Sequence, residues 1–183
     1  MMPLASWHLA PALIVPAALV APAHAAQYLG TEQAQKALFP EATAFVPHPL
    51  TLTDSQRAAV EKASGVRLRF VRPPVWRVEA NGRTLGWYVQ DEVYGKHEFI
   101  TYAMALDAAG AVRGLEILDY RETHGGQVRN AAWRAQFAGK RQGDPLKLGE
   151  DIQNISGATL SCKHVAEGVR RVLAIHQNAL ATP

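Results

Sequence analysis

Residues 85–118 read LGWYVQDEVYGKHEFITYAMALDAAGAVRGLEIL, and this stretch decides the fold class. It contains three runs that are rich in β-branched and aromatic residues, a composition that favours strands. The runs are 85–92, 99–106 and 112–118. Residues 95–97 (GKH) and 107–110 (DAAG) separate them and have the composition of turns. The stretch therefore predicts three consecutive antiparallel strands.

Two more strands are expected on the amino-terminal side of this stretch. Residues 75–79 are rich in β-branched and aromatic side chains, and the Asn81-Gly82 pair that follows is a strong signal for a tight hairpin. Residues 66–70 alternate apolar side chains with two arginines, as a strand with one buried face does. We therefore expect an antiparallel meander over the middle of the chain.

Helical patterns surround the meander. The expected helices are 27–39, 53–63, 130–138 and about 160–179. Thr31 is the expected N-cap of the first helix and Pro40 its stop, while Gly65 ends the second. The last helix has an apolar stripe, formed by Val165, Val169, Val172 and Leu173. The charged residues expected on its other side are Lys163, Glu167, Arg170 and Arg171.

Together these patterns predict an α+β fold, an antiparallel β-sheet meander packed with a few helices. We expect a helical segment over residues 26–65 and a single ligand-binding domain over residues 66–179. The chain has 183 residues, enough for one domain with its own hydrophobic core.

The first 25 residues have the features of an export signal. They contain no Asp, Glu, Lys or Arg, include the apolar run 9–20, and end in Ala23-His24-Ala25, an A-x-A cleavage site. A membrane anchor is the alternative, but the run is short for a span of roughly 20 residues and contains two prolines. We expect a signal peptide over residues 1–25, cleavage after Ala25, and a periplasmic or exported protein.

Charge and side-chain content exclude several classes of function. The net charge of +3 is too mild to indicate a nucleic-acid partner. Cys162 is the sole cysteine, which excludes an internal disulfide. We expect it to pack as a small hydrophobe, with a reactive thiol at a helix start as the alternative. His97, His164 and His176 are too dispersed for a metal site, and we expect none.

Residues 156–161, SGATLS, place hydroxyl groups and a glycine at the start of the last predicted helix. Helix starts leave backbone N–H groups without partners and carry the positive end of the peptide dipole, so they suit a phosphate. Gly157 allows close approach of the backbone, and Thr159 offers an oxygen for a phosphoester. The alternative is that Ser156 or Thr159 simply caps the helix.

Two motifs resemble the FMN-binding domain found in the C subunit of sodium-pumping NADH:quinone reductase, the G subunit of Rnf complexes and many small exported flavoproteins. Ser156-Gly157-Ala158-Thr159-Leu160-Ser161 resembles that family's S-G-A-T-x-[ST] flavinylation motif. Glu122-Thr123-His124-Gly125 is similar to its E-T-x-G loop. The family's W-x-x-Q-F-x-G-K run is matched by Trp133, Gln136, Phe137, Gly139 and Lys140. The resemblance extends from about residue 76 to 175.

The resemblance implies FMN as cofactor, joined through its phosphate to Thr159 by an exported flavin transferase, with Ser161 as a second and weaker candidate acceptor. The implied cofactor-binding residues are Thr159, Ser156, Gly157, Ala158, Leu160, Ser161, Glu122, Thr123, His124 and Gly125. The isoalloxazine ring would then pack near the loop formed by residues 122–125.

The chain departs from the family pattern at two positions. Gln153 stands where the family motif commonly has an acidic residue, six positions before the acceptor, and His124 stands where many members have proline. If the transferase needs the acid, FMN would be bound without a covalent link.

The expected function is that of an exported electron-transfer flavoprotein, associated with a membrane redox complex, with donor and acceptor proteins in the membrane or outside the cytoplasm. No nicotinamide fingerprint and no acid/base pair over a substrate is evident, so an electron carrier fits better than a stand-alone enzyme. The alternatives are an FMN-binding sensing or assembly module without redox turnover, and the electron-delivery subunit of an exported reductase.

Overall fold

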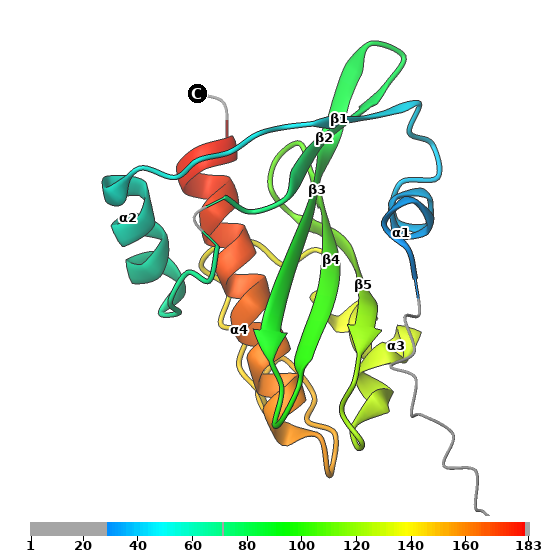
Figure 1. Ribbon diagram of the computed structural model, residues 1–183, viewed down its shortest axis with the longest axis vertical. Helices are drawn as coiled ribbons and strands as arrows, with labels where there is room; N and C mark the ends of the chain where they lie inside the picture. Colours follow the sequence, from blue (N-terminus) through cyan, green and yellow to red (C-terminus); the bar gives the residue numbers. More distant parts are fainter. Residues whose placement is uncertain (1–28, 71, 182–183) are drawn as a thin grey trace, which may run out of the picture.

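The computed structural model describes residues 29–70 and 72–181, and its centre is a five-stranded antiparallel sheet (Figure 1). The strands lie side by side in chain order, each paired with the next. They are β1 (Ala44–Pro47), β2 (Val75–Ala80), β3 (Arg83–Tyr94), β4 (Phe99–Asp107) and β5 (Val112–Tyr120). The predicted α+β meander is confirmed, whereas the predicted signal peptide at residues 1–25 lies outside the described residues.

The hairpin between β2 and β3 turns at Asn81-Gly82, as predicted. Both residues have positive φ, 50° and 73°, which matches the twist of the flanking strands in a two-residue turn. The longer turn at residues 107–110 joins β4 to β5, as expected from its composition.

The edge strand is a correction to the sequence analysis. Residues 66–70 are not a strand, and β1 pairs with β2 instead. The alternation in residues 66–70 serves to bury Leu68, whose amide donates to the side chain of Glu61 at 3.0 Å rather than to a neighbouring strand. Because the segment before residue 66 therefore contains a strand as well as helices, it adds to the sheet; the domain boundary at residue 65 stays a prediction.

The helices are α1 (Thr31–Leu38), α2 (Asp54–Ser64), α3 (Ala131–Arg134) and α4 (Thr159–Ile175). Short 3₁₀ turns cover Gly126–Arg129 and Ala135–Phe137, and a π-helical turn covers His176–Leu180. The predicted helix at 130–138 is thus split between α3 and a 3₁₀ turn. Within the described residues, no helix is long and apolar enough to cross a membrane.

Helix α2 begins and ends as its sequence predicts, whereas α1 ends before Pro40 as predicted but begins with a different cap. The hydroxyl of Thr53 accepts a hydrogen bond from the amide of Gln56 at 3.2 Å, and Gly65 closes α2 in a left-handed conformation. In α1 the N-cap is Gly30, not Thr31. The hydroxyl of Thr31 instead accepts a hydrogen bond from Gln90 on β3 at 2.8 Å, so a tertiary contact replaces the expected cap.

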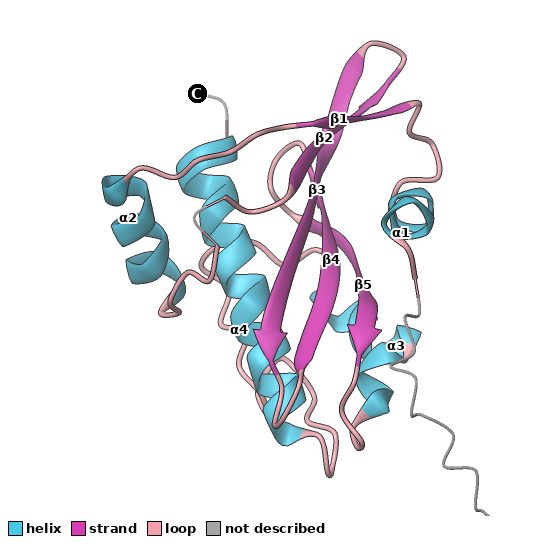
Figure 2. Ribbon diagram, in the orientation of Figure 1, coloured by secondary structure: helices cyan, strands magenta, loops and turns pink. Residues whose placement is uncertain are grey.

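The sheet is covered on both faces (Figure 2). Helix α4 packs against β3 and β4 on one face with α2 beside it, and α1 packs on the opposite face against β5 and β4. Successive side chains of β3 point to opposite faces of the sheet, so Val89 packs in the core on the α4 side and Tyr88 in the core on the α1 side. The predicted apolar stripe of α4 is confirmed as fully buried: Val165, Val169, Val172 and Leu173.

Arg171 is a second correction, since it lies on the buried side of α4 and not with the solvent-facing charges. Its guanidinium donates from Nε and Nη2 to Oδ2 of Asp91 on β3, at 3.0 and 2.5 Å. The hydroxyl of Tyr102 donates to the same oxygen at 2.7 Å. Burial raises the pKa of Asp91, and the adjacent Arg171 and Tyr102 oppose that rise. The pair fastens the middle of α4 to the sheet.

Replacing Arg171 by methionine is expected to lower the free energy of unfolding by about 3 kcal/mol, because it leaves the Asp91 carboxylate buried without its cation. Arg170→Met is the matched control, since the neighbouring side chain is only half-buried. Urea denaturation of both variants measures the difference. Equal losses in the two would contradict the proposed role of the buried pair.

Candidate functional site

Three segments that are distant in sequence meet at one end of the sheet. They are the β3–β4 turn, the loop that follows β5, and the first turn of α4, all at the lower end of Figure 1. They enclose a pocket of about 480 Å³, within the usual range for sites that hold a small molecule or cofactor. The lining residues are Lys96, His97, Glu122, Thr123, His124, Gly157, Ala158, Thr159, Leu160 and Ser161.

The first turn of α4 is open to a ligand. Its N-cap is Ala158, which has no side chain able to bond the free amides, and the first helical hydrogen bond runs from Cys162 N to Ala158 O at 2.9 Å. The amides of Thr159, Leu160 and Ser161 therefore precede the helical ladder. This contradicts the interpretation that Ser156 or Thr159 caps the helix.

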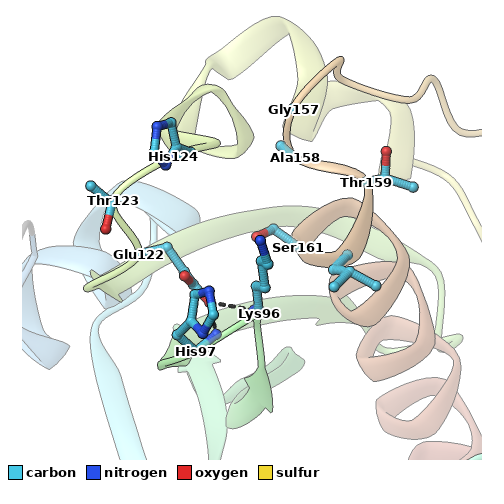
Figure 3. Close-up of a pocket in the computed structure, with 10 residues that line it drawn as sticks. Lys96, His97, Glu122, Thr123, His124, Gly157, Ala158, Thr159 and Ser161 are labelled. Carbon is cyan, nitrogen blue, oxygen red and sulfur yellow. Dashed lines mark hydrogen bonds between the residues drawn. The ribbon is translucent and has the colours of Figure 1, made fainter.

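The side chain of Thr159 is exposed at the edge of the pocket. Figure 3 shows it on the α4 side, with Thr123 and His124 on the opposite side. Asn154 donates a hydrogen bond to the hydroxyl of Thr159 at 3.2 Å. The hydroxyl keeps its proton and its second lone pair, so it can still donate and accept one further hydrogen bond. Gly157, two residues earlier, has a φ of +80°, a left-handed conformation in the turn that precedes α4.

The two predicted motifs contact each other through their smallest residues. Gly125 has φ of +86°, and a Cβ placed there would lie 2.6 Å from Cβ of Ala158 and 2.7 Å from the hydroxyl of Tyr120. That hydroxyl donates to the carbonyl of His124 at 2.5 Å and lies 3.2 Å from the hydroxyl of Ser161. Burial raises the pKa of Tyr120, so it serves as a neutral link between the loop and α4.

Glu122 acts on the backbone of the β3–β4 turn. Its Oε1 accepts hydrogen bonds from the amides of His97 at 2.6 Å and Glu98 at 3.1 Å, and from that of Lys96. Partial burial would raise its pKa, but these amide donors outweigh burial, so the pKa of Glu122 lies below its ordinary value. Gly95 makes the approach possible, since a Cβ there would lie 2.4 Å from the same oxygen. We call this arrangement the Glu122 clamp.

The W-x-x-Q-F-x-G-K run holds the segment that leads into α4. The indole N–H of Trp133 donates to the carbonyl of Gln153 at 2.8 Å, and the side-chain oxygen of Gln136 accepts from the amide of the same residue at 2.7 Å. Lys140 bonds the carboxylate of Asp151 at 2.8 Å. Trp133 and Phe137 are buried and do not line the pocket, so their contribution to the site is to fix the backbone at residue 153.

The structure brings the predicted site residues together. All of them line the pocket except Ser156, which is exposed just before it, and Gly125, which packs behind Ala158. Ser161 is buried, unlike Thr159. Cys162 is fully buried and burial raises the pKa of its thiol, so it packs as a small hydrophobe. The described residues contain no cluster of His, Cys, Asp or Glu suited to a metal ion.

The sequence analysis placed Lys96 and His97 in a turn and did not identify them as pocket residues. Both line the pocket, and the Lys96 side chain runs from the β3–β4 turn toward the first turn of α4 (Figure 3). The only local signal is Gly95 before them, and its meaning depends on Glu122, 27 residues later.

Comparison with known proteins finds a family model that covers the pocket residues. Residues 95–174 match the family model described as the FMN-binding domain. The G subunit of the Na(+)-translocating ferredoxin:NAD(+) oxidoreductase complex of Acetobacterium woodii is 27% identical over 110 residues, covering 55% of this chain and 53% of that protein. The chain thus spans about half the length of the curated relative that it matches.

Two solved structures share the fold. NqrC from Shewanella oneidensis has a TM-score of 0.55 and 17% identity, over 82% of this chain and 87% of that one. The C subunit of the Na(+)-translocating NADH-quinone reductase from Parabacteroides distasonis has a TM-score of 0.55 and 15% identity, over 85% and 86%. At these identities the likeness concerns the fold.

Gly125→Ala is expected to destabilise the protein by more than Gly157→Ala. Both glycines have positive φ, a backbone cost of about 1 kcal/mol for alanine, but only Gly125 also faces atoms closer than 3 Å. The Cβ at residue 157 would meet no atom within 4 Å. Urea denaturation of the two variants compares them, and equal effects would refute the close contact between the motifs.

The Glu122 clamp predicts a pH dependence. Because the pKa of Glu122 is lowered in the folded state, its contribution is complete above the ordinary carboxyl pKa and disappears as the pH falls through the lower, folded-state value. Glu122→Gln is therefore expected to lose less stability than the wild type between about pH 5 and pH 3. Glu98→Gln, on the same turn, is the control and should follow the wild-type curve, measured by denaturation at each pH.

Proposed function

We propose, from the premise that residues 95–174 form an FMN-binding domain similar to those of the Rnf G subunit and NqrC, that this chain is an electron-transfer flavoprotein with FMN joined through its phosphate to Thr159. The observation that carries the proposal is the exposed Thr159 side chain, which lines the pocket between the two motifs at the uncapped start of α4. Ser161, the other candidate acceptor, is buried and turned toward Tyr120.

The residues present fit the cofactor. A phosphate at Thr159 would lie against the free amides of the first turn of α4 and the positive end of the helix dipole. The ribityl chain and isoalloxazine would then extend toward Thr123 and His124 on the far side of the pocket. FMN supplies the redox chemistry when bound, while the chain anchors, orients and partly shields it.

Gln153 bears on how the threonine is modified. The backbone of this residue is held on both sides by Trp133 and Gln136, and its side chain is exposed. The segment therefore keeps its shape without an acidic side chain at this position. This supports attachment to Thr159 in spite of the departure from the family pattern.

The remaining parts of the proposal concern location and partners. Residues 1–25 would direct export and be cleaved after Ala25, and a flavin transferase outside the cytoplasm would modify Thr159. The donor and acceptor would be membrane or exported redox proteins, because the curated relative is part of an oxidoreductase complex. Covalent attachment suits such a location, where a lost cofactor is hard to replace.

The test is the intact mass of the full chain produced in its native host or together with a flavin transferase. We expect a mass greater by FMN less one water, loss of residues 1–25, and yellow fluorescence that survives a denaturing gel. Thr159→Ala should abolish the increment, because it removes the acceptor oxygen. Thr159→Ser should retain it at least in part.

Ser156→Ala and Ser161→Ala are matched controls on the same segment, and both should still carry FMN. A wild-type mass without the increment under these conditions, or an increment that persists in Thr159→Ala, would sink the covalent proposal. Flavin that dissociates on denaturation would instead assign a non-covalent FMN protein.

A further inference from the structure

The pocket contains a cation that no feature of the motifs accounts for. Lys96 lines the pocket at the β3–β4 turn, and its side chain extends toward the first turn of α4. Among the described residues, no carboxylate forms an ion pair with its ammonium group. Lys163, the other lysine near the first turn of α4, differs because it pairs with Glu167 at 3.9 Å and does not line the pocket.

The position of Lys96 is fixed by its own backbone. The Glu122 clamp binds the amides of three consecutive residues, of which Lys96 is the first, so its Cα is held to the loop after β5. Gly95 admits the carboxylate at a distance that no side chain would allow. The negative charge of Glu122 is occupied by these amides, while the Lys96 side chain is free to extend toward α4 (Figure 3).

Charge balance indicates which part of the cofactor this ammonium meets. A helix start supplies the equivalent of about half a positive charge, whereas the phosphodiester that would join FMN to Thr159 carries a full negative charge and free FMN, a phosphomonoester, carries about −1.5 to −2 at neutral pH. The free amides of α4 therefore leave a phosphate incompletely neutralised. Lys96 points at the same end of the pocket as those amides, and a lysine acts on phosphate as a compact point charge.

We propose that Lys96 is the cation that pairs with the FMN phosphate in this pocket, and that Glu122 is a positioning residue that presents Lys96 through the backbone of the β3–β4 turn. The proposal rests on the proposed function, because it takes FMN as the ligand and the start of α4 as the phosphate end. It assigns phosphate binding to Lys96 of the β3–β4 turn, and it assigns the positioning of that turn to Glu122, the acidic residue of the E-T-x-G loop.

The experiment uses the full chain carrying Thr159→Ala and made without a transferase, so that flavin binds reversibly. FMN and riboflavin are titrated by fluorescence quenching at two salt concentrations. Adding Lys96→Met should weaken FMN binding about tenfold and leave riboflavin binding unchanged, since riboflavin lacks the phosphate. The preference for FMN over riboflavin should fall with salt in the parent and much less in Lys96→Met. Lys96→Arg should restore most of the FMN affinity.

Two further variants separate the positioning role from general damage. Lys163→Met removes a lysine that lies one helical turn after Thr159 on α4, outside the pocket, and should keep the parent's FMN preference. Glu122→Ala should lose as much FMN affinity as Lys96→Met, and the double variant should lose no more than either alone, because both act through one contact. The Lys96→Met variant keeps the Glu122 clamp, because the clamp uses the backbone amide of residue 96 and not its side chain. The stability of Lys96→Met is therefore the reference against which the stability of Glu122→Ala is compared.

The outcomes are distinct. An unchanged FMN preference in Lys96→Met overturns this inference and leaves the proposed function standing. Equal loss of FMN and riboflavin places the ammonium against the ring system and also overturns it. Additive losses in the double variant overturn the positioning role of Glu122. A parent that binds neither flavin overturns the proposed function itself, and the inference with it.

Discussion

The packing of α4 along the sheet is the constraint on which the rest of the structure depends. Its apolar stripe is fully buried against β3 and β4, and Arg171 fastens the middle of the helix to Asp91. Because a long helix is stiff, fixing its body also fixes the position of its amino end. That end comes to lie beside the β3–β4 turn and the loop after β5, and the uncapped amides of α4 face a pocket rather than open solvent.

Around this helix, the side chains of the motif residues mainly form hydrogen bonds with backbone groups. Glu122 binds three amides of the β3–β4 turn, while Trp133 and Gln136 hold the two backbone groups of Gln153. Gly125 contributes the absence of a side chain, which allows the loop to touch Ala158. Polar side chains that satisfy buried or constrained backbone groups give a loop one shape, as a ligand site requires. Thr159, at the uncapped start of α4, and Lys96, in the β3–β4 turn, line the pocket.

Much of the fold followed from local pattern. Strand composition and hairpin chemistry predicted β2 to β5, the spacing of apolar residues predicted the stripe of α4, and Gly65 predicted the end of α2. The failures share one cause. The place beside β2 that was expected for residues 66–70 is taken by β1, and the cap expected at Thr31 and the exposed position expected for Arg171 were overruled by Gln90 and Asp91, all of them far along the chain. Local propensity carries no information about such partners.

The sequence by itself determined the class of fold, the location of both motifs and the choice of Thr159 as the candidate acceptor, because strand composition, turn residues and helix starts are local properties. Only the tertiary structure decided that Thr159 is exposed while Ser161 is buried, that Glu122 holds a turn, and that Lys96 lines the pocket. Each of these depends on which segments meet in space, and that is set by how α4 packs on the sheet.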